Sequence, residues 1–383
     1  MKVMVYMGHP AHFHLFKYII KDLVTGGDDV IIAIKSKDIL ENLLKSAEFS
    51  YINLLHKRRK PGKLHITAWE LKKHKALFSL CRRTKPDFLI GTSSAMPLVG
   101  RLLGIPSINV NEDDASVIPM YARISYPFSS VILTPAACDN GKWEYKSIKY
   151  NSYHELAYLH PKYFSADKSV VEKYIRSEKP FYLIRFSNLD AHHDKGISGI
   201  SHPQATELLS ILKPHGDVYI SSERPLPPAL ENHRIAINPL DIHHIMAFSR
   251  IFIGDSQTMC AEAGVLGTPF IRFNDFVGRI GYLRELEDKY GLGFGIKTIH
   301  SNKLIHTVED LLKIKDSQRE FLSRRQNMLK DKIDLNKLIL WLLLNYPESA
   351  STLYSDPNYS KRFGFGNLYG SSDNNKRKES EAL

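Results

Sequence analysis

The chain has 383 residues and a formal net charge of +11, and its hydrophobic share of 43% and charged share of 24% are those of a globular protein. This length exceeds one ordinary domain and favours two domains with a tail. The composition argues against a membrane-spanning protein, because no apolar run reaches the roughly 18 residues that cross a bilayer. It also argues against a disulfide scaffold, because the three cysteines have no paired or metal-binding spacing. We therefore expect a reducing, cytoplasmic setting and no signal peptide.

The positive charge is gathered in short basic runs at residues 57–60, 82–83 and 376–378. Basic surfaces attract nucleic acid, anionic lipid or phosphorylated substrates. No nucleic-acid-binding pattern with interleaved aromatic residues accompanies these runs, so we expect no nucleic-acid partner. Two interpretations stay open, namely a solvated charged face and peripheral contact with an anionic membrane that carries a lipid-linked acceptor.

The first half of the chain alternates between short apolar runs and helical patterns. Residues 2–7 predict a buried strand, followed by the loop Gly8 to His12 and a helix over residues 13–23. Further strands are predicted at residues 30–34, 86–91, 105–110 and 131–134, with helices at 39–44 and 99–103 between them. This order is typical of a parallel sheet covered by helices.

A polar stretch around residues 150–165 interrupts the alternation, and a second set then begins. Strands are predicted at residues 181–186, 217–221, 235–237, 251–254 and 269–272, and helices at 204–212, 242–248, 261–266 and within 308–345. The residues beyond Pro347 are rich in Ser, Asn, Gly and Lys and predict disorder. We therefore expect an α/β protein with two Rossmann-like domains, residues 1–155 and 165–345, and a disordered tail at 347–383.

Ligands of open parallel sheets bind at the carboxyl ends of the strands, and one such end is distinctive here. The strand at residues 251–254 ends in a small polar turn that opens a helix, and Ser256, Gln257 and Thr258 lie at its start. The first amides of a helix are unpaired and partly positive, which suits a diphosphate. Glu262, further along, could accept from ribose hydroxyls. The plainer interpretation is an ordinary helix capped by Asp255 or Ser256.

This segment resembles the nucleotide-binding stretch of non-hydrolysing UDP-N-acetylglucosamine 2-epimerases and MurG-type glycosyltransferases. Those families place a small serine turn on the diphosphate and a glutamate on the ribose before a Gly-x-Pro strand, and Ser256 and Glu262 match in spacing. Gln257 and Thr258 stand where the epimerases have Gly-Gly. In the first half, the loop from Gly8 resembles their first glycine-rich loop, and Glu112 falls where both families place a carboxylate.

The stretch at residues 185–194, Arg-Phe-Ser-Asn-Leu-Asp-Ala-His-His-Asp, resembles the signature of the DUF354 family, a relative of GT-B enzymes. The resemblance covers residues 1–345. It implies a GT-B-like fold in which the two Rossmann-like domains face each other across a cleft. It further implies that the amino-terminal domain takes an acceptor and the carboxyl-terminal domain a nucleotide-sugar.

Histidines and carboxylates supply the candidate catalytic groups. His9, His12 and His14 cluster after the first strand, and His12 at the helix mouth could act as a general base. Glu112 is the second candidate base, and Asp113 beside it could bind sugar hydroxyls. Helix capping and solvated acidic side chains are the alternatives.

Further candidates follow strands of the second half. Arg185 could neutralise charge on a leaving diphosphate, and His193 and Asp194 could orient each other. We expect no metal site there, because adjacent residues rarely point inward together. Asn274 and Asp275 follow the next strand, where related families approach the donor sugar. The pair His243 and His244 is interpreted as structural.

These features give three hypotheses. The first is a glycosyltransferase of surface polysaccharide biosynthesis, which needs no cofactor besides its nucleotide-sugar donor and passes the sugar to a glycan or lipid-linked acceptor. The second is a sugar-nucleotide 2-epimerase, which needs carboxylates on both faces of the sugar. The loop Gly8-His9-Pro10-Ala11-His12 lacks the Arg-Pro-Glu of the epimerases, which argues against it. The third is a binding protein without catalysis.

Overall fold

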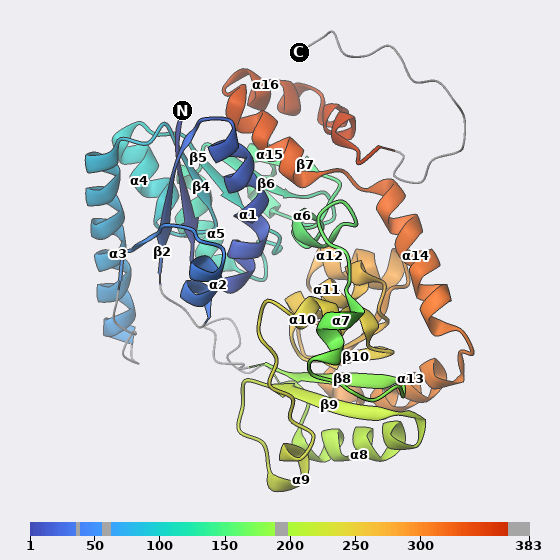
Figure 1. Cartoon of the computed structure of the whole chain (residues 1–383). Coiled ribbons are helices and arrows are strands. Elements are labelled where there is room, and N and C mark those ends of the chain that lie inside the picture. The colour runs from blue at the N-terminus through green and yellow to red at the C-terminus, as the bar shows by residue number, and fades with distance from the viewer. Residues whose placement is uncertain (36–38, 56–62, 188–197, 367–383) are drawn as a thin grey trace.

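The computed structural model describes residues 1–35, 39–55, 63–187 and 198–366, and these residues form two lobes, each built on a parallel sheet (Figure 1). The cysteines Cys81, Cys138 and Cys260 are buried and unpaired. Among the described residues, no helix is long and apolar enough to cross a membrane.

The amino-terminal lobe contains a parallel sheet in the order β3-β2-β1-β4-β5-β6-β7. The strands are β1 Lys2–Met7, β2 Asp29–Ile34, β3 Ile52–Asn53, β4 Phe88–Gly91, β5 Ser107–Val110, β6 Val131–Pro135 and β7 Ser147–Tyr150. The helices are α1 Pro10–Thr25, α2 Leu40–Ser46, α3 Lys63–Thr84, α4 Met96–Leu103 and α5 Pro119–Ser125, with short 3-10 turns η1 Tyr126–Phe128 and η2 Gly141–Lys146. Central strands of such a sheet are covered on both faces, which explains their continuous apolar runs.

The carboxyl-terminal lobe contains a second parallel sheet in the order β12-β11-β10-β8-β9. Its strands are β8 Phe181–Phe186, β9 Asp217–Ser222, β10 Ile251–Gly254, β11 Phe270–Phe273 and β12 Gly293–Ile296. Its helices are α8 His202–Leu212, α9 Pro228–Glu231, α10 Ile242–Phe248, α11 Gln257–Leu266, α12 Gly281–Arg284, α13 Ser301–Lys313 and α14 Ser317–Asp331, with the turns η3 Lys213–His215, η4 Glu285–Lys289 and η5 Thr298–His300.

The sequence predicted most of these strands, but it missed β3, β7 and β12 and placed one strand where none forms. Residues 235–237 form no strand. The chain meets β9 there only through a single bridge between Ile220 and Arg234 and the bond from the Ile235 amide to the Ile220 carbonyl. Pro239 follows closely and cannot donate to a ladder, so the contact does not extend.

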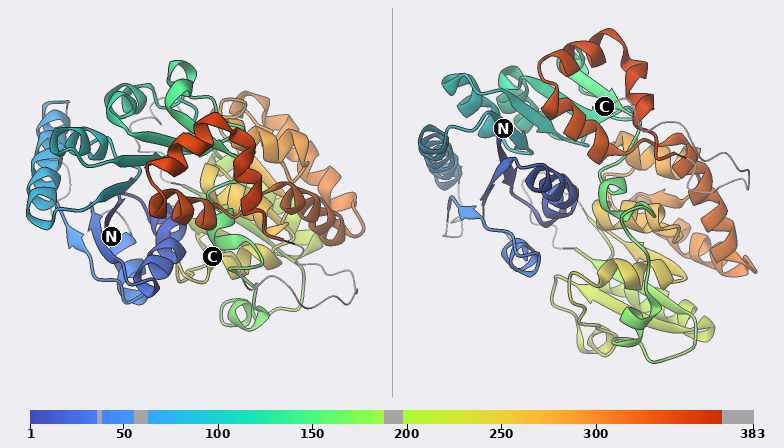
Figure 2. Two further views of the ribbon diagram at one scale, coloured as in Figure 1. Left: turned by 90° about the horizontal axis from the view of Figure 1, so that it is seen from above. Right: turned by 45° about the horizontal axis from the view of Figure 1, so that its top comes forward.

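The end of the chain returns to the amino-terminal lobe. The connecting helices are α6 Leu156–Leu159 and α7 Lys168–Glu172, and the terminal elements are α15 Leu335–Leu344, α16 Glu348–Ser355 and η6 Pro357–Phe363. Helix α1 packs on both α6 and α15, and Figure 2 shows the terminal helices beside the amino-terminal lobe. The predicted tail therefore starts too early, because Trp341 packs on Tyr359 and Phe363, with ring centroids 4.9 and 5.3 Å apart.

The strand orders identify where each sheet can receive a ligand. In the first sheet the connections leave β1 on one side and return at β4 on the other, and in the second sheet the same reversal separates β8 and β10. Ligands of open parallel sheets bind outside the carboxyl ends of the strands at this reversal. The relevant loops therefore follow β1, β4, β8 and β10.

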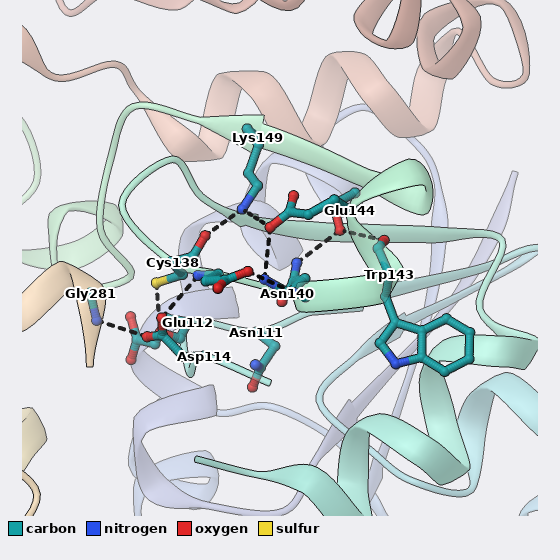
Figure 3. A network of polar contacts seen from close by, with 12 residues as sticks. Asn111, Glu112, Asp114, Cys138, Asn140, Trp143, Glu144, Lys149 and Gly281 are labelled. Atoms are coloured by element: carbon teal, nitrogen blue, oxygen red, sulfur yellow. Dashed lines mark hydrogen bonds and ion pairs between the residues drawn. The ribbon is translucent and has the colours of Figure 1, made fainter. Parts of the chain in front are cut away.

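The lobes meet through a backbone contact beside these loops (Figure 3). Gly281, the first residue of α12, donates its amide to Asp114 Oδ2 at 2.7 Å, and Asp114 Oδ1 accepts from the Asp139 amide at 3.0 Å. A Cβ added at Gly281 would lie 1.9 Å from the Ala137 carbonyl oxygen. Only glycine therefore allows the two backbones to approach this closely.

We expect the substitution Gly281→Ala to destabilise the protein by about 1–3 kcal/mol, because the added methyl group overlaps a backbone atom that cannot rotate away. Urea unfolding of the full chain measures the change. Gly364→Ala is the matched control, since its added Cβ would lie 3.6 Å from the nearest atom, the Lys361 carbonyl oxygen. Equal unfolding midpoints for the two variants would contradict the close approach at Gly281.

Candidate functional site

Helix α11 begins directly after β10, at the reversal point of the second sheet. Ser256 caps it, because its hydroxyl accepts from the Met259 amide at 3.3 Å and its carbonyl accepts from the Cys260 amide at 3.2 Å. The amides of Gln257 and Thr258 have no acceptor among the described residues, and both side chains are half-buried. The helix therefore presents two amide donors and its positive dipole end to any anion that lies there.

The turn before the helix is held by a buried carboxylate. Asp255 Oδ1 accepts from the Ser187 amide at 2.7 Å and from its hydroxyl at 2.6 Å, and Oδ2 pairs with Arg224. Burial raises the pKa of Asp255, against the opposing effect of these partners. Arg224 also lies over the Phe186 ring. A guanidinium therefore stands close to the start of α11, a position that no sequence pattern indicated.

Arg185, which we expected beside a leaving diphosphate, contacts two residues of its own lobe. It donates to the Ser221 hydroxyl at 2.7 Å and pairs with Glu223, at the carboxyl ends of β8 and β9. Its Nε is buried and has no hydrogen-bond partner. The guanidinium is thus partly neutralised within its own lobe, and Arg224 is the cation beside Asp255.

The two residues that follow β11 act inside the protein. Asn274 is fully buried and donates to the Asp255 carbonyl at 3.0 Å, so it supports the turn before α11. Asp275 accepts from the Ser198 amide at 2.8 Å and from Thr298. These bonds lower the pKa of Asp275 and join two loops. The structure therefore assigns both residues positioning roles within the loops. His193 and Asp194 lie outside the described residues.

Glu262 is the carboxylate of α11, and its Oε1 is held from two sides. It accepts from the Tyr158 hydroxyl at 2.8 Å and lies 3.0 Å from His243 Nε2. Its Oε2 has no hydrogen-bond partner among the described residues. Tyr158 belongs to the connecting helix α6, which packs on α1 of the amino-terminal lobe and on α11 itself, so this bond lies where the two lobes meet. His243, which the sequence indicated as structural, is therefore a polar partner of the Glu262 carboxylate.

His14 of α1 completes a buried group that we call the junction cluster, which consists of His14, Tyr158, His243 and Glu262. The ring of His14 lies 5.1 Å from both the Tyr158 and the His243 rings. Burial and the neighbouring His243 lower the pKa of His14 well below its usual value, so the ring is neutral. Lys17 lies 5.9 Å from the Tyr158 ring, and burial lowers its pKa to about 8.

The histidines of the first loop are hydrogen-bonded to backbone. His9 Nδ1 accepts from the Ala11 amide at 3.2 Å, which caps α1, and His12 Nδ1 accepts from the Gly8 amide at 3.1 Å. A neutral ring whose Nδ1 accepts must carry its proton on Nε2. His12 as a general base and His9 as a substrate-binding residue stay predictions.

The three acidic residues after β5 have separate roles. Asp114 fixes the lobe contact described above, whereas Asp113 is half-buried and helps to raise the pKa of Glu112. Glu112 Oε2 lies 3.2 Å from His154 Nδ1 and 3.4 Å from the His154 amide. Burial, followed by the charge of Asp113, raises the pKa of Glu112 well above its usual value.

A second carboxyl group lies close to Glu112. Glu155 is fully buried, and neither of its oxygens has a hydrogen-bond partner. Burial, followed by the charge of Glu112, raises the pKa of Glu155 well above its usual value, so it is a neutral acid near pH 7. The charge of Glu262 on α11 also raises the pKa of both Glu112 and Glu155.

The described residues contain no group of three or more His, Cys, Asp or Glu side chains that could hold a metal ion. The arrangement brings together three kinds of chemical group. The start of α11 offers amide donors for an anion, Glu262 offers an oxygen for hydroxyl groups, and Glu112 with His154 and Glu155 can exchange protons.

Comparison with solved structures relates this geometry to known proteins. A UDP-GlcNAc 2-epimerase from Neisseria meningitidis bound to UDP-GlcNAc shares 17% identity at a TM-score of 0.64, over 90% of this chain and 100% of that one. A Streptomyces glycosyltransferase complexed with thymidine diphosphate shares 14% identity at a TM-score of 0.56, over 88% and 99%. A spinosyn rhamnosyltransferase complexed with spinosyn aglycone shares 13% identity at a TM-score of 0.58, over 90% and 100%.

At these identities the likeness establishes the fold, which is the expected GT-B-like arrangement of two Rossmann-like lobes. No curated protein matches the sequence. The family described as "Protein of unknown function (DUF354)" matches residues 1–346, and the chain therefore belongs to the DUF354 family.

Proposed function

We propose that this protein is a glycosyltransferase that moves a sugar from a nucleotide-sugar donor to a glycan or lipid-linked acceptor in surface polysaccharide biosynthesis. The observation that carries the proposal is the start of α11, where the amides of Gln257 and Thr258 have no acceptor in the described part of the chain. Glu262, whose Oε1 accepts from Tyr158, lies on the same helix. A nucleoside diphosphate matches both features, because it combines an anionic pyrophosphate with a ribose that donates hydroxyl protons.

The donor would bind to the carboxyl-terminal lobe. Its diphosphate would accept from the α11 amides, and its ribose hydroxyls would donate to Glu262. The helix dipole then stabilises the charge that develops on the departing diphosphate. Arg224, rather than Arg185, is the guanidinium placed beside the turn before α11. The acceptor would enter from the amino-terminal lobe.

The solved relatives support a nucleotide-sugar ligand, since the Neisseria protein holds UDP-GlcNAc and the Streptomyces protein holds thymidine diphosphate. They support both transfer and epimerisation as reaction types. Transfer is favoured here because the loop from Gly8 to His12 has no carboxylate or arginine.

One observation keeps epimerisation as a second candidate. The half-buried Glu112 and the fully buried Glu155 are two carboxyl groups near the junction, and an epimerase needs acid and base groups on its substrate. Incubation with UDP-GlcNAc in D₂O separates the reactions. An epimerase incorporates deuterium at C2 of the sugar, whereas a glycosyltransferase leaves the C2 hydrogen in place and releases UDP.

Contact with an anionic membrane is part of the proposal, and one face of the amino-terminal lobe suits it. Helix α4 packs beside α5 and η1, and these elements expose Leu102, Met120, Ile124 and Phe128. Arg101 and Arg123 lie on the same helices. Apolar side chains among cations match the interface of an anionic bilayer, where a lipid-linked acceptor would be found.

We expect Thr258→Asp to abolish nucleotide binding without lowering the stability of the unliganded protein. A carboxylate at the second helical position interacts favourably with the dipole, by about 0.3–1 kcal/mol, but repels a diphosphate. Thermal unfolding with UDP-, GDP-, CMP- and dTDP-sugars measures the effect, because a ligand at 100 times its Kd stabilises by about 2.7 kcal/mol.

Asn302→Asp is the matched control, since Asn302 is the second residue of α13 and is exposed. It should keep the full ligand-induced shift. If the wild-type protein gains no stability from any of the nucleotide-sugars, the proposed function is wrong. If Thr258→Asp keeps the shift, the ligand does not bind at the start of α11.

We expect Tyr158→Phe to lower stability by about 1.5–3 kcal/mol, because a buried carboxylate loses a hydrogen-bond donor. UDP binding should weaken as well, since Glu262 is no longer held in one orientation. Urea unfolding and UDP titration measure the two effects. Tyr354→Phe is the control, because Tyr354 donates to the Lys146 carbonyl at an exposed site and should cost far less. Equal stability of the two variants would refute the role of Tyr158.

We expect Met120→Asp to weaken binding to vesicles of phosphatidylglycerol by at least about tenfold, because it removes a large apolar group and adds a repelled charge. Met120 is 72% exposed, and Ile299 on the other lobe is 78% exposed, so Ile299→Asp is a control of equal accessibility. Vesicle co-sedimentation compares them. Equal losses would place the contact elsewhere or show that it is non-specific.

A further inference from the structure

The reversal point of the first sheet carries a group of polar side chains that the nucleotide site does not include. Ser94 follows β4 there, and helix α3 passes over the same end of the sheet. Lys73 of α3 donates to the Ser94 hydroxyl at 2.9 Å and lies 2.6 Å from Glu70 Oε2. The Ser94 hydroxyl in turn donates to Glu70 Oε2 at 3.0 Å. Three side chains from two segments therefore form one closed set of contacts.

The first strand reaches the same place through Tyr6, which packs with α3 and α4 in one apolar cluster. Burial, followed by the charge of Glu70, raises the pKa of Tyr6, and a hydrogen bond with Ser93 opposes the shift. A Cβ added at Gly8 would lie 3.3 Å from Tyr6 Cε1, so the ring lies against the first loop. The loops after β1 and β4 thus meet beside Glu70, where open parallel sheets bind their ligands.

We call Tyr6, Glu70, Lys73, Ser93 and Ser94 the α3 cluster, and Lys73 is its least expected member. The side chain of Lys73 is 8% exposed, whereas that of Glu70 is 38% exposed. An ion pair with a buried partner rarely stabilises a fold more than apolar side chains of similar size would. The pair therefore adds little to the attachment of α3, and its main effect is to hold Glu70 in one orientation.

Glu70 has one carboxylate oxygen left for a ligand. Burial acts to raise the pKa of Glu70, but the charge of Lys73 and the hydrogen bonds from Lys73 and Ser94 outweigh it and lower the pKa, so the group is ionised near pH 7. Both partners use Oε2, and Oε1 has no hydrogen-bond partner among the described residues. An ionised oxygen that is held in place and partly exposed is a strong hydrogen-bond acceptor.

The residue before Glu70 adds an aromatic group. Trp69 is half-buried, and its Nε1 is a buried donor that finds no hydrogen-bond partner in the part of the chain that the structure describes. Buried donors without partners are uncommon in native proteins. An indole ring packs against C–H groups while its N–H donates, and a sugar offers both C–H faces and acceptor oxygens.

The charges of the α3 cluster indicate the class of ligand. Lys73 is matched by Glu70, so the cluster has no net charge with which to attract a phosphate. Its open position is the acceptor oxygen Glu70 Oε1, which repels an anion but accepts from a hydroxyl group. The two sheets therefore offer different chemistry, because the start of α11 presents donors to an anion and the α3 cluster presents an acceptor to hydroxyl groups.

We propose that the α3 cluster binds an uncharged sugar of the acceptor, with Glu70 Oε1 accepting from its hydroxyl groups. This inference rests on the proposed function, since it takes the bound sugar to be part of the acceptor. It narrows the acceptor to a glycan or the glycan part of a lipid-linked glycan, rather than a lipid phosphate without sugar. Because Glu70 is 38% exposed, the sugar reaches it without a change in the docking of the lobes.

The test measures binding of the full chain to an array of uncharged oligosaccharides of hexose and N-acetylhexosamine, together with their phosphorylated counterparts. We expect binding to one or more uncharged sugars and weaker binding to the phosphorylated forms. Glu70→Gln should weaken sugar binding by at least about tenfold, because bonds to a charged acceptor become bonds to a neutral one. The thermal shift given by UDP should stay unchanged, because the α3 cluster and α11 belong to different lobes.

Glu231→Gln is the matched control, because Glu231 also precedes its cation, Arg234, by three residues, also at 2.6 Å, and is 48% exposed. It should keep the wild-type affinity for the sugar. Glu70→Gln leaves Lys73 buried without a counter-charge, so a second variant combines it with Lys73→Met and removes the pair together. This double variant should unfold at the wild-type urea midpoint and still lose the sugar. A pair that only fastens α3 would give a lower midpoint and unchanged sugar binding.

Three outcomes overturn the inference, namely no uncharged sugar bound by the wild-type protein, binding of phosphorylated sugars only, and wild-type affinity in both Glu70 variants. The proposed function fails separately. A protein that binds sugar through Glu70 but shows no thermal shift with any nucleotide or nucleotide-sugar keeps the α3 site and refutes the proposed function. A protein that shifts with UDP and binds no sugar keeps the proposed function and refutes the α3 site.

Discussion

The hydrogen bond from Tyr158 to Glu262 joins the two lobes at the point on which the site depends. A carboxylate removed from water is unfavourable unless donors replace the water, and Glu262 finds its donors on α6 and α10. One of these donors, Tyr158, belongs to the connecting helix α6, which also packs on α1 of the amino-terminal lobe. The orientation of Glu262, and with it the ligand-facing side of α11, therefore depends on how the lobes are docked.

Two kinds of contact hold the lobes together at that junction. At Gly281 the backbones of the two lobes touch, and no side chain could be accommodated, so this contact is rigid. Around Glu112, His154 and Glu155 the contacts are polar and partly unsatisfied. Buried polar groups without partners are uncommon in native proteins, and here they lie between lobes that the Gly281 contact holds in register.

Hydrogen-bond partners that are distant or belong to the backbone decide how the histidines are held. The sequence places three histidines after β1 and none of their partners is visible in it. In the structure, Nδ1 of His9 accepts from the Ala11 amide and Nδ1 of His12 accepts from the Gly8 amide. His154, which has no motif around it, lies with Nδ1 3.2 Å from a carboxylate oxygen of Glu112.

The sequence by itself determined the elements whose signals are local. Apolar runs marked β1, β8, β10 and β11, and the polar turn with Ser256 marked the capped start of α11, because strand periodicity and helix capping depend only on neighbouring residues. The repetition of that pattern indicated two lobes, and the resemblance to known families implied their GT-B-like pairing. Only the tertiary structure decided which side chains form hydrogen bonds and ion pairs with one another. Tyr158 meets Glu262 across 104 positions of sequence, and Arg224 reaches Asp255 across 31. The terminal helices return to the first lobe for the same reason, since packing between distant segments depends on the docking of the lobes and leaves no periodic signal in the chain.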